Sequence, residues 1–139
     1  MNTKKLFTIG LLGAIAVALG ALGAHFLKSK LQSGLITPDQ LIGFDTGVKY
    51  QMYHVFGMIA VFLIQKQHPH KFLNWAYACF FWGIILFSGS LYFLTTRNLL
   101  GADWLKVLGP ITPIGGLCFV AGWIFLAIVG LKAKQTISN

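Results

Sequence analysis

Four stretches of the chain consist almost entirely of apolar residues. They cover residues 7–26, 48–64, 72–94 and 113–131. About 20 helical residues at a rise of 1.5 Å each cross a hydrocarbon core of about 30 Å. Three of the stretches have about this length, and the second is shorter and carries polar residues. The pattern predicts an all-α protein: an integral membrane four-helix bundle, with residues 1–139 forming a single domain.

The segment before the second stretch has its own helix signal. Thr37 and Pro38 are typical of an N-cap followed by proline at the first helical position, and Gln40 completes a capping box. This start predicts an interfacial helix, or a helix extension that leads into the second span. At the fourth stretch, Thr112 and Pro113 predict a cap and the first helical residue in the same way.

The composition supports a membrane protein. The chain is 56% hydrophobic and 10% charged, with a mean hydropathy of +0.72, whereas a soluble domain has roughly a quarter of its residues charged. The net charge of +8 could suit a nucleic acid, but no basic run stands clear of the apolar stretches. We therefore exclude nucleic acid and expect the lipid bilayer to be the main partner, with the cations at the headgroups.

The N-terminus resembles a signal peptide because Lys4 and Lys5 precede an apolar run. That run is long enough to span a membrane, so we interpret it as the first transmembrane helix. Four spans place both termini on one side, together with the turn after the second span. This side has six cations, whereas the other has five. The positive-inside rule then predicts that both termini are cytoplasmic.

The densest polar cluster lies at the start of the second span. Gln51 and His54 share one helical stripe with Gly43, Gly47 and Gly57, at spacings of 4, 4, 3 and 3. Polar groups at membrane depth usually face other helices. Counted along each helix, several polar residues from the other three helices reach a similar depth. The predicted ligand site or structural hydrogen-bond network contains His25, Lys49, Tyr50, Gln51, His54, Ser88, Ser90 and Thr112.

Small residues predict where the helices approach each other closely. Gly13, Gly20 and Gly23 form a stripe on the first span. We assign the same packing role to Gly43 and Gly47 before the second span and to Gly115 and Gly116 at the start of the fourth.

Other site chemistries fit the pattern less well. His25 and His54 differ by roughly 12 Å in height, so we expect no metal site and no cofactor. A Ser-His-Asp triad would need Asp45, which lies on a different stripe from His54. Cys79 and Cys118 also differ by about 10 Å in height, too far for a disulfide.

Four ordered motifs resemble a known family. They are "GALGAH" (20–25), "TGVKYQMYH" (46–54), "LFSGSLY" (86–92) and "GPITPIGG" (109–116). In this order they are similar to the domain-of-unknown-function family numbered four-two-three, which consists of small bacterial membrane proteins with a eukaryotic transmembrane relative. The resemblance implies a four-helix protein of the bacterial inner membrane, and it implies no activity.

Three functions remain open from the sequence. The first is a non-enzymatic module that binds a lipid, a second copy of the chain or another membrane protein. The second is a small transporter or channel subunit with a polar site around His54. The third is a membrane-embedded enzyme, for which the chain offers only scattered polar residues.

Overall fold

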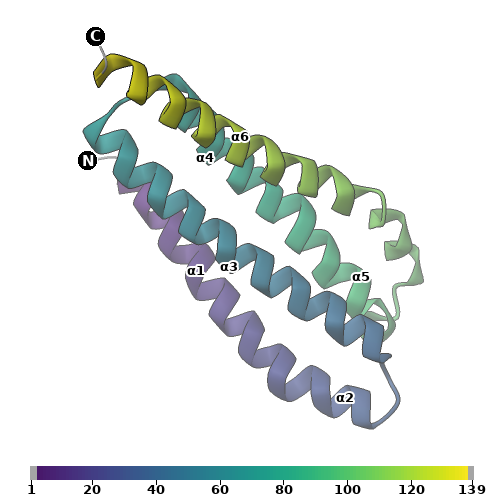
Figure 1. Ribbon diagram of the computed structural model, residues 1–139. Helices are drawn as coiled ribbons and strands as arrows, with labels where there is room; N and C mark the ends of the chain where they lie inside the picture. Colours follow the sequence, from purple (N-terminus) through teal and green to yellow (C-terminus); the bar gives the residue numbers. More distant parts are fainter. Residues whose placement is uncertain (1–2, 138–139) are drawn as a thin grey trace.

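The computed structural model describes residues 3–137, with side chains up to residue 132. The described chain forms four helical rods of 30 residues each that pack as a bundle (Figure 1). A rod of this length is about 45 Å long, which matches a bilayer together with its headgroup layers. All four rods are long and apolar enough to cross a membrane. The predicted all-α four-helix bundle is therefore confirmed.

Three of the four rods change their helical type along their length. Rod 1 consists of α1 (Thr3–Leu22), the π-helix η1 (Gly23–Leu27) and α2 (Lys28–Gln32). Rod 2 is the single helix α3 (Pro38–Gln67). Rod 3 consists of α4 (Lys71–Gly83), the π-helix η2 (Ile84–Ser88) and α5 (Gly89–Leu100). The 3₁₀ helix η3 (Asp103–Leu108) precedes α6 (Ile111–Ile137) in the fourth rod.

The predicted capping box starts α3. The Thr37 hydroxyl accepts from the Gln40 backbone N–H at 3.3 Å, and the Gln40 side chain accepts from the Thr37 N–H at 2.9 Å. The helix then runs without a break to Gln67. The segment before the second span is thus a helix extension, not a separate interfacial helix.

Several predicted helix boundaries are wrong. The third rod continues past residue 94 to Leu100, and the fourth continues past residue 131 to Ile137. The first rod continues past residue 26 through η1 and α2, since polar residues at headgroup depth can remain helical. The fourth helix begins at Ile111, before the predicted cap at Thr112. Pro113 fits inside this first turn because the first four helical N–H groups have no partner within the helix. The Thr112 hydroxyl is free to bond elsewhere.

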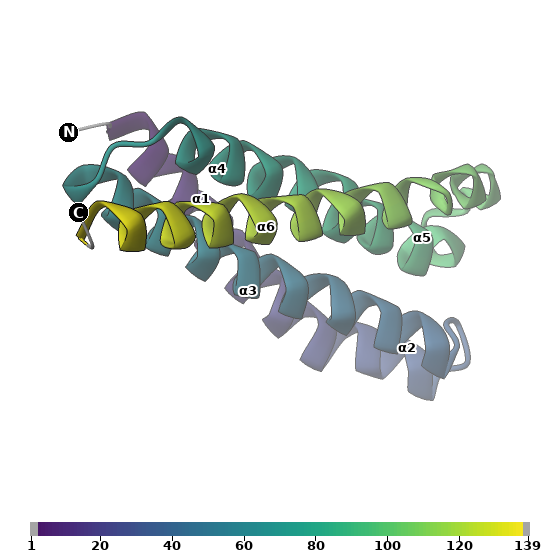
Figure 2. The same ribbon diagram turned by 45° about the horizontal axis from the view of Figure 1, so that its top comes forward.

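Rod 2 lies between rod 1 and rod 3, and α6 packs along α4 and η2 (Figures 1 and 2). Figure 1 shows the two ends of the chain at the same end of the bundle, beside the turn between α3 and α4. The opposite end carries residues 33–37 and 101–110 and is called the loop end below. Figure 2 shows α2 at the loop end well separated from the start of α6.

Two apolar clusters form the core. The larger one is centred on Met58, Leu73 and Phe80, and it joins α1, α3, α4 and α6. The smaller one contains Leu27, Ile36 and Phe44 at the loop end. Large apolar side chains also cover the outside of the bundle, as expected where the solvent is lipid.

The glycines of α1 and α3 lie at helix contacts. A Cβ on Gly13 or Gly20 would lie 3.6 or 3.5 Å from a valine of α3, and one on Gly23 would lie 3.2 Å from Phe44. Gly43 and Gly47 face rod 3 more tightly, at 2.7 Å from Thr95 and 2.9 Å from Tyr92. The contact between the first rod and α3 therefore has room for a methyl group at Gly13 and Gly20. The contact between α3 and α5 has no such room at Gly43 and Gly47.

The two glycines of α6 differ. A Cβ on Gly115 would lie closer than 3.0 Å to backbone atoms of Leu86 and Phe87 in η2. A Cβ on Gly116 would lie 3.8 Å from the Phe87 ring, an ordinary contact. Gly115 thus marks a direct approach of two helix backbones.

Candidate functional site

Gln51 joins three of the four rods. Its side chain is buried on α3, with 2% of its surface exposed. The amide nitrogen donates to the Leu12 carbonyl of α1 at 2.7 Å, and the amide oxygen accepts from the Tyr92 hydroxyl of α5 at 2.8 Å. Tyr92 was not among the predicted site residues. It lies four residues after Ser88, so one helical turn could have pointed to it.

His54 is also buried, with 5% of its surface exposed. Its Nδ1 lies 2.6 Å from the Tyr50 carbonyl, so this nitrogen carries a proton and donates it. The indole N–H of Trp123 in α6 donates to Nε2 at 3.2 Å. An indole can only donate, so Nε2 is unprotonated and the ring is neutral. The ring also stacks on Phe119, with centroids 3.4 Å apart and planes at 7°.

His54 does not bond to Ser88 or Thr112, which were predicted for the same network. The histidine does bond to the fourth rod, but through Trp123, eleven residues beyond Thr112. Ser88 is fully buried in η2, and its hydroxyl has no hydrogen-bond partner in the described part of the chain. Counting residues gives depth along a helix, and it does not give the rotation of the neighbouring helix toward His54.

Ser90 and Thr112 form a separate pair between α5 and α6. Their hydroxyl oxygens lie 2.6 Å apart, and Ser90 also donates to the Phe87 carbonyl at 3.0 Å. A serine hydroxyl has one hydrogen, so Thr112 is the donor in the pair. Thr112, which lies inside α6, thus ties this helix to α5.

Two predicted residues, His25 and Lys49, lie outside these pairs. His25 is exposed on η1 because it is two residues from both buried neighbours, Gly23 and Leu27, and so points to the opposite face. Lys49 is exposed and pairs with Asp45 at 2.6 Å. Tyr50 is 40% exposed but belongs with His54, because its carbonyl accepts from Nδ1 and the two rings stack with centroids 6.1 Å apart. The Tyr50 ring also packs on Phe87, with centroids 4.8 Å apart. The eight residues therefore do not form one site, but separate pairs that tie different rods together.

The histidines, acidic residues and cysteines are dispersed over the described part of the chain. Among the described residues, no three His, Cys, Asp or Glu side chains gather as metal ligands would. The two cysteines, Cys79 and Cys118, are free thiols.

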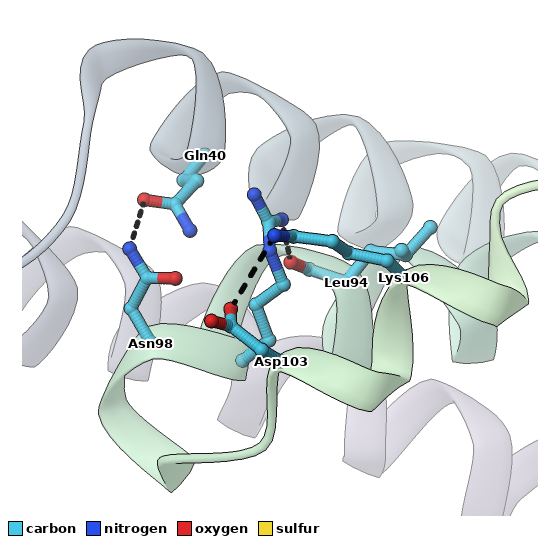
Figure 3. Close-up of polar contacts among 6 residues, drawn as sticks. Gln40, Leu94, Asn98, Asp103 and Lys106 are labelled. Carbon is cyan, nitrogen blue, oxygen red and sulfur yellow. Dashed lines mark hydrogen bonds and ion pairs between the residues drawn. The ribbon is translucent and has the colours of Figure 1, made fainter.

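A polar cluster at the loop end was not predicted from the sequence (Figure 3). Gln40 accepts weakly from the Asn98 amide, at 3.5 Å. Arg97 donates through Nη1 to the Leu94 carbonyl, and Lys106 pairs with Asp103 at 3.7 Å. The cluster, called the loop-end cluster below, comprises Gln40, Arg97, Asn98, Asp103 and Lys106. Gln40 is far in the sequence from the other four residues, and those four lie near the end of α5 or in η3. No sequence motif therefore indicated them as a group.

Two hollows adjoin this cluster. A pocket of about 370 Å³ is lined by Arg97, Asn98, Gly101, Ala102 and Asp103. Beside it runs an apolar groove of about 530 Å³ between α5, η3 and α6, called the α5–α6 groove below. Its lining residues are Ile85, Leu86, Ser90, Phe93, Leu100, Ala102, Trp104, Leu105, Leu108 and Ile111. Ala102 lines both hollows, so they adjoin at this residue.

A smaller groove lies on the other side of the bundle. It has a volume of about 300 Å³ and runs between rod 1 and α3, where Gly20 and Gly23 are part of its wall and Lys28 is at one end.

The chain is similar to a family of membrane proteins along most of its length. The profile of the family described as "Protein of unknown function (DUF423)" matches residues 19–116. A UPF0382 membrane protein of Staphylococcus epidermidis is 39% identical over 130 residues, which cover 93% of this chain and 97% of the relative. The UPF0382 membrane protein YwdK of Bacillus subtilis is 38% identical over 132 residues, with 93% and 98% covered.

A more distant relative is the UPF0382 inner membrane protein YgdD of Escherichia coli. It is 30% identical over 123 residues, which cover 88% of this chain and 86% of the relative. No solved structure matches the chain. The matched range includes all four motifs that suggested the resemblance, and the relatives are covered almost from end to end. This chain belongs to the DUF423 (UPF0382) family of membrane proteins, whose function is unknown.

Proposed function

We propose that the protein is a non-enzymatic lipid-binding module. The α5–α6 groove is the observation that carries this proposal. Its volume of about 530 Å³ lies within the usual range of ligand sites, and its walls are almost wholly apolar. It lies on a surface that four membrane-spanning rods would present to lipid. An acyl chain seated there would gain many small dispersion contacts with fixed walls.

The groove has a shape that suits one chain of a lipid. Ile85 and Leu100 mark its extent along rod 3. They are 15 residues apart, which corresponds to about 22 Å of helix. Phe93 and Trp104 supply aromatic walls, and the groove meets the polar pocket at Ala102. An apolar channel that ends at a polar pocket is complementary to a molecule with a chain and a headgroup.

The central polar pairs support a structural role rather than transport. Both ring nitrogens of His54 are occupied by protein groups, and one ring face is covered by Phe119. Gln51 uses its amide to join rods 1, 2 and 3. Hydrogen bonds of this kind stabilise membrane helix pairs by about 0.6 kcal/mol on average.

Replacing Leu108 with tryptophan should test the groove. The larger side chain fills the α5–α6 groove, so retained lipid should fall about tenfold, which is equivalent to about 1.4 kcal/mol. Native mass spectrometry from mild detergent measures the lipid adducts directly. The control is Ile114→Trp, which adds the same bulk on an exposed position of α6 outside the groove. Equal lipid retention by Leu108→Trp and the control would argue against the proposal.

We also propose that the protein lies in the inner (cytoplasmic) membrane with both termini in the cytoplasm. The Escherichia coli relative is named an inner membrane protein. The end of the bundle that holds both termini has more cations than the loop end, six against five, and the positive-inside rule assigns the richer side to the cytoplasm.

Cysteine labelling tests this orientation. Cys79 and Cys118 are first replaced by serine to remove the native thiols. A single cysteine is then introduced at Ser33 or at Gln67, which lie at opposite ends of the bundle. In intact cells an impermeant maleimide should label the cysteine at Ser33 and spare the one at Gln67. Both should be labelled once the membrane is opened. The reverse pattern in intact cells would place the termini outside.

A further inference from the structure

We infer that the loop-end cluster binds the phosphate of a glycerophospholipid whose acyl chain occupies the α5–α6 groove. This inference rests on the proposed lipid-binding function and specifies the chemistry of the ligand. It follows from four observations: an unpaired amide nitrogen on Gln40, an unpaired donor on Arg97, the charge of the cluster, and a pocket that adjoins the groove at Ala102.

Gln40 presents a buried donor that the described protein leaves unused. Its side chain is 6% exposed, and its Nε2 has no hydrogen-bond partner among the described residues. The orientation of the amide is fixed, because the oxygen must face the Thr37 N–H that it accepts at 2.9 Å. Figure 3 shows the oxygen turned to Asn98 and the nitrogen turned to the side of Leu94 and Lys106.

Arg97 supplies a second unused donor on that side. Its Nη1 donates to the Leu94 carbonyl, but its buried Nε has no partner within the described chain. A buried donor that stays unsatisfied destabilises the fold, so a ligand that accepts from it gains affinity. A phosphate oxygen can accept from such groups, and guanidinium forks suit phosphate geometry. Arg97 lines the polar pocket, and Gln40 lies beside Asn98 of its wall, so the two donors favour an oxygen-rich anion as the ligand.

The charges of the cluster also fit a phosphodiester. Arg97 and Lys106 contribute two positive charges and Asp103 contributes one negative charge, which leaves one net positive charge. Asp103 is 79% exposed and already paired with Lys106, so water and the lysine both weaken its repulsion of an anion. A lipid phosphodiester carries one negative charge and neutralises the cluster.

The position of the cluster selects a lipid over free phosphate. Arg97 lies in the last turn of α5 and Gln40 in the first turn of α3, both at the loop end. Rods of about 45 Å bring this end to the depth of the headgroups. Trp104, 72% exposed, stands beside the pocket, as tryptophan commonly does at a membrane interface. From Ala102 the apolar groove leads toward the centre of the bundle.

The test compares phosphatidylglycerol with diacylglycerol of the same acyl chains, each added to the delipidated protein and counted by native mass spectrometry. The wild type should retain at least tenfold more of the phospholipid. Arg97→Gln should lower phosphatidylglycerol to the level of diacylglycerol, and Lys106→Gln, on an exposed side chain, should lower it by about threefold. Lys28→Gln, a cation at the same end on the other groove, should have no effect. Inorganic phosphate at millimolar concentration should not displace the lipid.

Each outcome bears on one of the two proposals. The phosphate site would be overturned if the wild type retained the two lipids equally. It would also be overturned if Arg97→Gln and Lys106→Gln both retained as much phosphatidylglycerol as the wild type. Displacement by inorganic phosphate would show an anion site independent of the groove and would also overturn it. The groove itself is judged by Leu108→Trp, which should lower both lipids together. Failure of any lipid to bind to the wild type would instead reject the lipid-binding function.

Discussion

Replacing Gly115 by alanine is expected to lower the free energy of unfolding by about 3 kcal/mol. The added Cβ would lie within 3.0 Å of backbone atoms of Leu86 and Phe87. A side chain could rotate away from such a contact, but the backbone of η2 cannot, so α6 must move off rod 3. The measurement is thermal unfolding in mild detergent, where we expect the midpoint to fall by about 10 °C.

The neighbouring glycine is the matched control. Gly116→Ala makes the same chemical change one residue later, where the Cβ meets only the Phe87 ring at 3.8 Å. Both variants reduce the conformational freedom of the unfolded chain equally, so their difference reports the contact in the folded state. Similar midpoints for Gly115→Ala and Gly116→Ala would mean that α6 and η2 do not approach each other as described.

Replacing His54 by alanine is expected to destabilise the bundle by a comparable amount, also about 3 kcal/mol. The imidazole stacks on Phe119 at 3.4 Å and lies 5.5 Å from the Phe80 ring, so its removal leaves a cavity in the larger core cluster. The variant also removes the acceptor for the Trp123 indole N–H. His54→Leu keeps most of the volume and should cost about 1 kcal/mol.

A double-mutant cycle separates the hydrogen bond from the cavity. Trp123→Phe removes the indole donor and keeps an aromatic ring on α6. Unfolding of the wild type, His54→Leu, Trp123→Phe and the double variant should give a coupling of about 0.6 kcal/mol, the average for such bonds in a membrane protein. A coupling of zero would contradict the Trp123 bond. Unchanged stability of His54→Ala would contradict the burial of the ring.

Much of the fold could be predicted from the sequence because it depends on local, periodic signals. Apolar stretches of about 20 residues predicted the four spans, since a helix must satisfy its own backbone in lipid. The capping box at Thr37 and Gln40 set the start of α3, since both of its bonds join residues three apart. Helix ends were predicted less well. Polar residues at headgroup depth carry no hydropathy signal, although their backbone remains helical.

The contacts of the polar residues were only partly predictable. The stripe through Gln51 and His54 predicted burial, and both side chains are buried. Their partners were not predicted: Tyr92 and Trp123 come from rods whose rotation a residue count does not give. His25 had a suitable estimated depth, but it points outward from η1.

The sequence by itself determined that the chain has four apolar helices and where small residues could bring them close, because both depend on spacing within one segment. Only the tertiary structure decided which faces meet. It brought Gly115 against the backbone of η2, joined Ser90 to Thr112, and placed Asn98 beside Gln40, 58 positions earlier in the chain. Such contacts depend on the relative rotation and height of packed helices, which are fixed by the fit of all side chains together.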